Sequence, residues 1–231
     1  MILHKTKAIV LNRRNYGEAD RIISVLTPDN GKLSLIAKGA RSMKSKLAGA
    51  IELFTINDIG YIEGRGELCT LTYGRLERNF PDIVKDIDRV QLGYEVLKNV
   101  DKSTDTVVES DYYSLLGEAF AGLDDPSIDS CLIKLWYLAR LIAISGHTPN
   151  LVKDANGTVL SENKRYGFDP AAMNFFVQNG VGIYRPIHIK FLRIVFVCTK
   201  PGPLKRINGA AGLADDLQPL INQIYNYHLN S

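Results

Sequence analysis

The residues with the most evident chemistry are cations gathered in one short segment. Lys38, Arg41, Lys44 and Lys46 lie within nine residues that contain no acid and several small, flexible residues (KGARSMKSK). Such a segment can follow an irregular phosphate backbone, because phosphate contacts supply affinity through counterion release without reading bases. The pattern therefore indicates a binding site for a polyanion. A solvated basic loop with no partner is the alternative interpretation.

Three arginines and one aromatic residue extend this hypothesis. Arg13, Arg14 and Arg21 lie in the same part of the chain and are expected to support the basic surface. Tyr16, between Asn15 and Gly17 in a polar turn, is the best candidate for an exposed ring on which a base stacks, since single strands are held by stacking as well as by charge. The other aromatics of this region, Phe54 above all, are expected in the core.

Signatures of catalysis are weak. The sequence contains no G-x-x-x-x-G-K-[ST], G-x-G-x-x-G or G-x-S-x-G motif, and its four histidines show no metal-ligand spacing. Cys69, Cys131 and Cys198 are widely spaced and are expected to be buried thiols, not a disulfide framework or a zinc cluster. The pairs Asp124-Asp125 and Asp215-Asp216 are interpreted as acids at helix starts. We therefore expect no enzymatic activity, no metal and no other cofactor.

Five strands must position these residues. Hydrophobic runs and period-two alternation predict strands at residues 8–11, 21–27, 33–38, 53–62 and 68–76. A Pro-Asp-Asn-Gly turn at residues 28–31 and the glycines of residues 63–66 suit the connections between them. Five strands in about 80 residues with mostly short connections predict a small closed or nearly closed barrel.

After Phe80-Pro81 the hydrophobic period changes from two to 3.6. Apolar stripes predict helices around residues 87–97, 112–123, 187–199 and 215–227. A further helix is expected to open at Asp125-Pro126, as N-cap and first helical residue, and to stop at Gly146. Residues 147–183 are rich in turns and hold only short β-like pieces such as residues 174–178. The fold class is therefore multi-domain, with β and α parts.

Composition places the chain among soluble folded proteins. It has 231 residues, 45% of them hydrophobic and 23% charged. The net charge of +3 divides into +5 for residues 1–80, −6 for residues 81–150 and +4 for residues 151–231, so a basic end suggests an anionic partner. No apolar run approaches the roughly 20 residues that span a bilayer, and the start lacks the apolar region of a signal peptide. We expect a cytoplasmic chain without a membrane partner.

Several blocks resemble the N-terminal domain of the RecO family of bacterial recombination mediators. They occupy residues 8–11 (AIVL), 16–22 (YGEADRI), 26–28 (LTP), 38–41 (KGAR), 47–49 (LAG) and 64–68 (GRGEL). Similarity beyond residue 80 is looser, although residues 82–146 and 145–151 (SGHTPNL) fit the layout of the family. The resemblance implies an OB-fold in residues 1–80. It also implies an α-helical domain in residues 81–231 with a small zinc-ribbon-like insertion at about residues 148–183.

The resemblance also implies a function in the RecF pathway of DNA repair. Members bind single- and double-stranded DNA, anneal complementary strands and help load RecA onto strands covered by single-strand-binding protein. The implied partners are RecR and the C-terminal tail of single-strand-binding protein, with RecA acting indirectly. The alternative is mainly a protein adaptor with little intrinsic DNA binding. An enzyme acting on nucleic acid would need clustered carboxylates with a metal, and the sequence places none.

Two details depend on the helical region. Arg140, Lys190 and Arg193, on otherwise apolar helices, are candidates for holding the terminal carboxylate of that tail, against ordinary surface pairing. Many family members close a zinc site with two C-x-x-C pairs, but the matching residues 151–157 and 175–180 contain no cysteine. We expect no zinc here, and an insertion held by packing or hairpin contacts through three phenylalanines, Phe168, Phe175 and Phe176.

Overall fold

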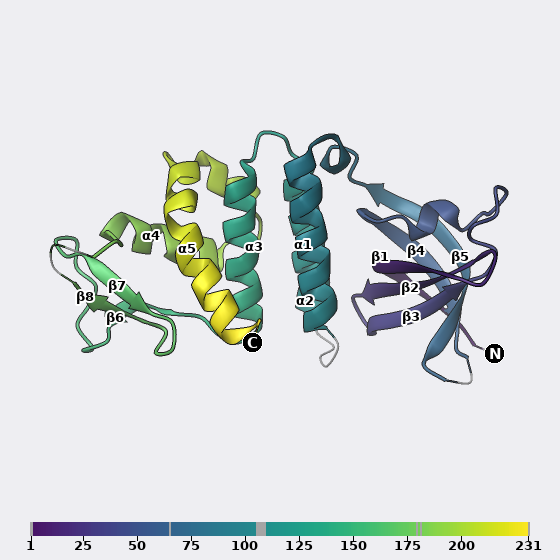
Figure 1. The fold of residues 1–231 in the computed structure, drawn as a ribbon, viewed down its shortest axis with the longest axis horizontal. Helices are drawn as coiled ribbons and strands as arrows, with labels where there is room; N and C mark the ends of the chain where they lie inside the picture. The colour runs from purple at the N-terminus through teal and green to yellow at the C-terminus, as the bar shows by residue number, and fades with distance from the viewer. Residues whose placement is uncertain (1, 65, 105–109, 179, 181, 231) are drawn as a thin grey trace. The chain divides into compact units, whose positions relative to one another are not determined.

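The chain folds into two compact units, residues 1–126 and residues 127–231. The computed structural model describes residues 2–64, 66–104, 110–178, 180 and 182–230 (Figure 1). The first unit holds five strands and the two helices that follow them. The second holds three helices and a small sheet. The division into domains of residues 1–80 and 81–231 stays a prediction.

The five predicted strands form a closed barrel. They are β1 (Leu3–Tyr16), β2 (Asp20–Thr27), β3 (Gly31–Ala37), β4 (Thr55–Ile62) and β5 (Leu68–Asn79). Their order around the barrel is β1-β2-β3-β5-β4, in which β3 and β5 pair in parallel and every other pair is antiparallel. A five-stranded Greek-key barrel of this kind is an OB-fold, so the predicted fold of this part of the chain is confirmed.

Alternate residues of each strand fill the barrel. Val10, Ile23, Val25 and Leu35 are fully or almost fully buried in one cluster with side chains from β4 and β5, as the period-two pattern requires. A short 3-10 helix, Ala48–Ile51, closes part of the barrel between β3 and β4. The barrel interior is therefore a packed hydrophobic core.

Phe54 joins the barrel to the helices of its unit. Its side chain is 5% exposed, its backbone is left-handed with φ of 58°, and its ring meets those of Tyr94 at 5.5 Å and Phe120 at 5.4 Å. A Cβ on Gly93 would stand 2.7 Å from that ring, so the close approach requires a glycine there. The expected core position of Phe54 is confirmed.

Helices α1 (Ile87–Ser103) and α2 (Ser110–Leu123) complete the first unit. The side chain of Asp86 caps α1 by accepting hydrogen bonds from the backbone N–H groups of Asp88 and Arg89. The Nη1 of Arg89 is directed inward and donates to the carbonyls of Leu123 and Asp125, where α2 ends. A buried guanidinium thereby satisfies carbonyls that the end of a helix leaves without partners.

Helices α3 (Ser130–Ile144), α4 (Pro186–Val197) and α5 (Ala210–His228) form the second unit. The prediction that a helix opens at Asp125-Pro126 is wrong: α3 begins at Ser130, because Asp129 caps it and accepts from the N–H of Cys131. Helix α5 begins at Ala210 and not at Asp215, so Asp215 and Asp216 lie inside it. None of the described helices is long and apolar enough to cross a membrane.

The turn-rich segment forms a three-stranded sheet of β6 (Asn150–Asp154), β7 (Tyr166–Asp169) and β8 (Asn174–Val177), in the order β6-β8-β7. Phe175 is fully buried at its centre, and its ring meets those of Phe168, Tyr166 and Tyr184 at 4.9 to 6.4 Å. Phe176 lies on the opposite face, 38% exposed. Aromatic packing thus occupies the middle of this sheet, while the absence of zinc stays a prediction.

His188 connects α4 to α5. It is almost fully buried, its Nδ1 accepts from the N–H of Arg185 at 3.1 Å, and its Nε2 lies 3.2 Å from Oδ2 of Asp216. The ring therefore carries its proton on Nε2 and donates it to Asp216. Burial, with the positive charge of Arg185, lowers the pKa of His188 although Asp216 opposes the shift.

We expect acid to destabilise the second unit through His188. Its folded-state pKa lies below the ordinary 6.5, so as the pH falls below about 6.5 the unfolded state takes up the proton first. The stability present above this pH is lost as the pH falls toward the folded-state pKa. Thermal unfolding from about pH 7.5 to 5 should show a shallower dependence for His188→Gln than for the unmodified protein. Equal slopes for the two proteins would contradict the assignment.

Candidate nucleic-acid interface

The cationic segment is fastened to the loop between β1 and β2. The backbone N–H of Arg41 donates to the carbonyl of Ala19 at 2.8 Å, and that of Gly39 donates to Oδ1 of Asp20 at 2.7 Å. The Nη1 of Arg41 also donates to the carbonyl of Gly17 at 3.3 Å. Gly17 and Gly39 both have left-handed backbones, with φ of 55° and 63°. Two segments about 20 residues apart in the sequence therefore form one surface.

The four cations of this segment are available for binding. Lys38, Arg41, Lys44 and Lys46 are all exposed, and in the described part of the chain none of them forms a salt bridge. Tyr16, the last residue of β1, is 53% exposed at the edge of the same surface. The structure thus brings together five of the eight residues predicted to bind DNA. Their contacts with a nucleic acid stay a prediction.

The three supporting arginines divide between two sides of the sheet. A β-bulge between Val10 and Asn12 shifts the alternation of β1, so that Arg13 stands opposite the core residue Ile23 and Arg14 opposite Ile22. Directly opposed residues point to the same face. Arg13 therefore points to the core side, whereas Arg14 is exposed on the outer face.

Glu52 holds the two arginines on the core side. Its Oε2 lies 2.5 Å from Nη1 of Arg13, and its Oε1 lies 4.0 Å from Nη1 of Arg21. Both guanidinium groups are about three-quarters buried, with side-chain exposures of 30% and 26%. The charge of this pair is thus partly neutralised, and of the three supporting arginines only Arg14 is exposed.

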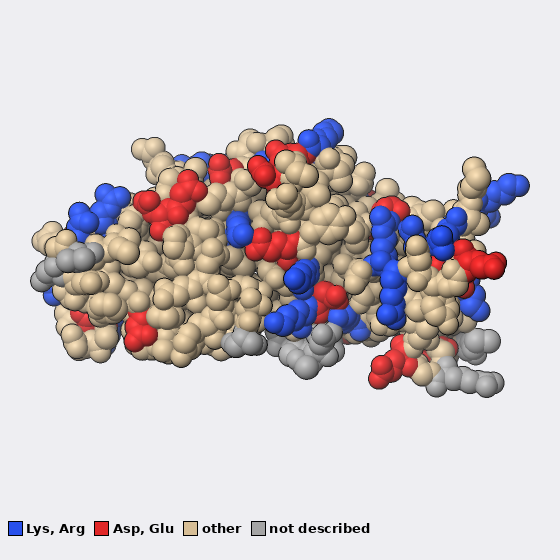
Figure 2. All heavy atoms as spheres, in the orientation of Figure 1, with Lys and Arg blue, Asp and Glu red and all other residues tan. Residues whose placement is uncertain are grey.

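A polar groove of about 290 Å³ lies on the outer face of β1, β2 and β3. Alternate residues of the three strands line it, namely Asn12, Arg14, Ser24, Lys32 and Ser34, and Arg13 and Asp101 also contribute to its polar lining. At its edge Nζ of Lys32 lies 2.5 Å from Oδ1 of Asp101 in α1. In Figure 2, Lys and Arg side chains form a row over the barrel in this view. In OB-folds the face of strands 2 and 3 and the neighbouring loops bind oligonucleotides.

Four of these groove residues were missed by the sequence analysis. Ser24 and Ser34 each lie between apolar residues, whereas Asn12 precedes Arg13 and Lys32 follows a turn, and nothing in the local composition marks the four as one surface. The available signal was the period of two, which places Ser24 opposite both Asn12 and Ser34. Arg65, in the β4–β5 connection, lies outside the described residues.

The three candidate partner-binding cations of the second unit are not gathered. The Nη1 of Arg140 donates to the carbonyl of Phe196, at the end of α4, at 2.7 Å. The Nε of Arg193 donates to the carbonyl of Leu151 at 2.7 Å, and Lys190 pairs with Glu162. Lys190 and Arg193 share a cavity of about 100 Å³ to which Arg140 contributes nothing.

The described residues show no constellation for catalysis. They contain no group of three or more His, Cys, Asp or Glu side chains that could hold a metal ion. Burial raises the pKa of the Cys131 thiol to about 12, so it stays protonated at neutral pH. What this surface can do chemically is hold an extended polyanion by charge and by one exposed ring.

We expect the variant Glu52→Gln to bind polyanions more tightly, because it releases the charges of Arg13 and Arg21. The variant should leave a heparin column at higher salt than the unmodified protein. Glu162→Gln is the matched control: it also removes one negative charge, but it frees Lys190 in the other unit. A Glu52→Gln shift no larger than that of the control would show that the two arginines take no part in the surface.

Comparison with known proteins gives one consistent family. A family model described as "Recombination protein O N terminal" matches residues 1–80. The "DNA repair protein RecO" of Rubrobacter xylanophilus is 30% identical over 181 residues, 78% of this chain and 72% of that protein. Proteins of the same name from Roseiflexus sp. and Desulfatibacillum aliphaticivorans are 33% and 29% identical over 69% and 63% of this chain. The aligned part spans 56% and 58% of these two, less than two thirds of their length.

Proposed function

The chain belongs to the RecO family of DNA repair proteins, and from this premise we propose that it binds single- and double-stranded DNA and anneals complementary strands. We further propose that it helps load RecA onto single strands covered by single-strand-binding protein. It does so as a mediator, without a catalytic step of its own. The division of labour follows the two predicted domains, with DNA on residues 1–80 and protein partners on residues 81–231.

The observation that carries the proposal is the cationic segment with no acidic partner. The segment exposes four cations, Lys38, Arg41, Lys44 and Lys46. By contrast, Arg13 and Arg21 both pair with Glu52. Cations without carboxylate partners attract a polyanion strongly, because each phosphate contact releases a condensed counterion. The backbone hydrogen bonds of Gly39 and Arg41 fix the start of the segment beside Tyr16 and the groove of β1, β2 and β3. A strand on this surface would meet phosphate contacts and one stacking ring without base-specific groups.

Protein partners are proposed for the second unit. RecR and the C-terminal tail of single-strand-binding protein are the partners, and RecA is reached indirectly. The exposed side chains of Ile187, Ile194 and Val197 lie along one face of α4, at helical spacing. Lys190 lies among them, so an acidic and apolar tail would find both complements there. This apolar stripe is also what favours the second candidate function, a protein adaptor with little intrinsic DNA binding.

For the DNA-binding function we expect the double variant Lys44→Ala, Lys46→Ala to bind single-stranded DNA more weakly and with less salt dependence. The slope of log affinity against log salt should fall by about 0.7 for each phosphate that the variant no longer neutralises. Fluorescence anisotropy of a labelled single strand, titrated at several salt concentrations, measures both quantities. Lys98→Ala, Lys153→Ala, which removes two exposed lysines elsewhere, is the control. Unchanged binding by the first variant would remove this segment from the site.

For the partner function we expect Ile194→Asp to weaken binding of the tail peptide of single-strand-binding protein by at least about tenfold, because it places a carboxylate in the apolar stripe. Binding of single-stranded DNA should not change. Isothermal titration calorimetry with the synthetic tail peptide measures the first effect. If the protein binds the peptide but no DNA at any salt, the adaptor function replaces the mediator function.

A further inference from the structure

A second groove lies on the outer face of β1, β4 and β5. It encloses about 630 Å³ and is lined by Leu3, Lys5, Lys7, Asp58, Tyr73 and Arg75, among others. None of its lining residues belongs to the groove of about 290 Å³ on β1, β2 and β3. The proposed function does not use it, so its occupant has to be inferred from its own chemistry.

Strand β1 contributes cations to both grooves. Its first half pairs with β4, where Lys5 and Lys7 stand opposite Gly60 and Asp58. Its second half pairs with β2, where Arg14 stands opposite Ile22. In a regular strand, Lys5 and Lys7 would point to the face opposite that of Arg14. The bulge between Val10 and Asn12 shifts the alternation by one residue, so all three point outward. One strand thus presents positive charge to two separate outer faces of the barrel.

Two exposed apolar side chains, Leu3 and Tyr73, line the second groove and lie beside the buried Gly60. A Cβ on Gly60 would lie 3.4 Å from Cδ1 of Leu3 and 3.4 Å from Cβ of Tyr73. Leu3 is 52% exposed and Tyr73 is 45% exposed. An exposed aromatic ring is a surface on which unpaired bases stack, whatever their identity.

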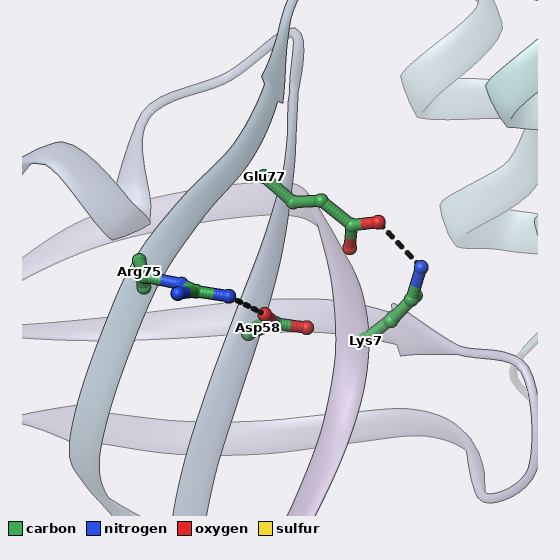
Figure 3. Close-up of polar contacts among 4 residues, drawn as sticks. All are labelled: Lys7, Asp58, Arg75 and Glu77. Carbon is green, nitrogen blue, oxygen red and sulfur yellow. Dashed lines mark hydrogen bonds and ion pairs between the residues drawn. The ribbon is translucent and has the colours of Figure 1, made fainter.

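Three cations, Lys5, Lys7 and Arg75, line this groove, and two of them form ion pairs with carboxylates. In Figure 3, Lys7 is directed toward Glu77 and Arg75 toward Asp58. The Nη2 of Arg75 lies 2.9 Å from Oδ2 of Asp58. The hydrogen bonds to these carboxylates, with the charges behind them, raise the pKa of both Lys7 and Arg75. In the described part of the chain Lys5 has no salt-bridge partner. Positive charge therefore exceeds negative charge by one.

The ion pairs of Lys7 and Arg75 are solvent-exposed and therefore weak. Lys7 and Arg75 have side-chain exposures of 53% and 70%, and ion pairs this exposed contribute little to stability. A phosphate can therefore take either cation from its carboxylate at small cost, whereas a neutral ligand gains nothing from them. An anionic ligand with flat apolar parts would therefore meet both the cations and the exposed ring of Tyr73.

We propose that this groove is a second binding site for single-stranded nucleic acid, so that one protein molecule holds two strands on two faces of its barrel. A base stacks on Tyr73, and the phosphates on either side meet Lys5, Lys7 and Arg75. A duplex does not suit the groove, because its bases are already stacked on one another. The first strand rests on the proposed function, whereas the second site stands on the groove itself.

Photocrosslinking of the full chain locates the second strand. A thymidine oligonucleotide with 5-iododeoxyuridine, irradiated with the protein, should label Tyr73, and mass spectrometry identifies the labelled peptide. The label should persist in the Lys44→Ala, Lys46→Ala variant, in which the first site is weakened. An oligonucleotide that binds the unmodified protein at saturation without labelling Tyr73 or a groove lysine overturns the proposal. The proposed function then still stands on the first site.

Energy transfer tests whether both strands are held at once. Two non-complementary oligonucleotides, one carrying a donor and one an acceptor, should show transfer when mixed with the protein, in a complex that sedimentation shows to contain one protein and two strands. The variant Lys5→Ala, Lys7→Ala, Tyr73→Leu should weaken binding of the second strand at least about fivefold, the lower end of what removing one base stack costs. Lys85→Ala, which removes an exposed lysine paired with Asp82, should have no effect.

A variant that gains affinity distinguishes an effect on the site from a loss of folding, because a misfolded protein would bind more weakly. Asp58→Asn should bind the second strand several-fold more tightly, because it removes a repelling carboxylate and frees Arg75. Strong binding of one strand with no transfer overturns the second site and leaves the proposed function intact. Absence of binding by any strand defeats the proposed function instead. An acidic, apolar peptide that binds the groove while both strands remain bound in the groove variants would assign the site to a protein partner.

Discussion

The barrel closes because β1 is long enough to pair with two strands in succession. Its 14 residues pair first with β4 and then with β2, and the bulge at Val10/Asn12 lets a single strand turn from one neighbour to the other while Ala8 and Val10 stay in the core. The same bulge decides which arginine faces outward. Closure of the fold and the distribution of surface charge therefore have one cause.

Much of this architecture could be predicted from the sequence, because the hydrophobic period marks the barrel core and the helix stripes. The length of β1 could not: only residues 8–11 form an apolar run, and the flanking HKTK and NRRNY are mostly polar because their alternate side chains face solvent. Partners on both sides make them a strand. The prediction of a helix from Asp125-Pro126 was wrong because a capping residue starts a helix only where the residues after it adopt helical backbone angles. Here the chain continues as a turn that buries Ile128, and Asp129 caps the helix.

The candidate site divides in the same way. A run of lysines without acids is visible in composition, so the cationic segment could be found. Glu52 could not be assigned to Arg13, because 39 positions separate them and the barrel alone brings them together. Arginine has more than one use in this chain. Three arginines donate hydrogen bonds to backbone carbonyls and so stabilise helices and loops: Arg89, Arg140 and Arg193. The exposed lysines of the cationic segment form no salt bridge within the described part of the chain. A guanidinium count alone cannot separate these uses.

The far end of the cationic segment is set by Gly74. A Cβ at this position would lie 2.4 Å from Cβ of Ala50 in the 3-10 helix that follows the segment. With one end fixed by Gly39 and Arg41 and the other seated on Gly74, the residues between them are a loop with stationary ends. Lengthening such a loop costs little, since closure entropy grows only with the logarithm of length. Insertions there can lengthen the segment while the barrel stays unchanged, whereas a side chain at position 74 would clash with Ala50 and displace the 3-10 helix.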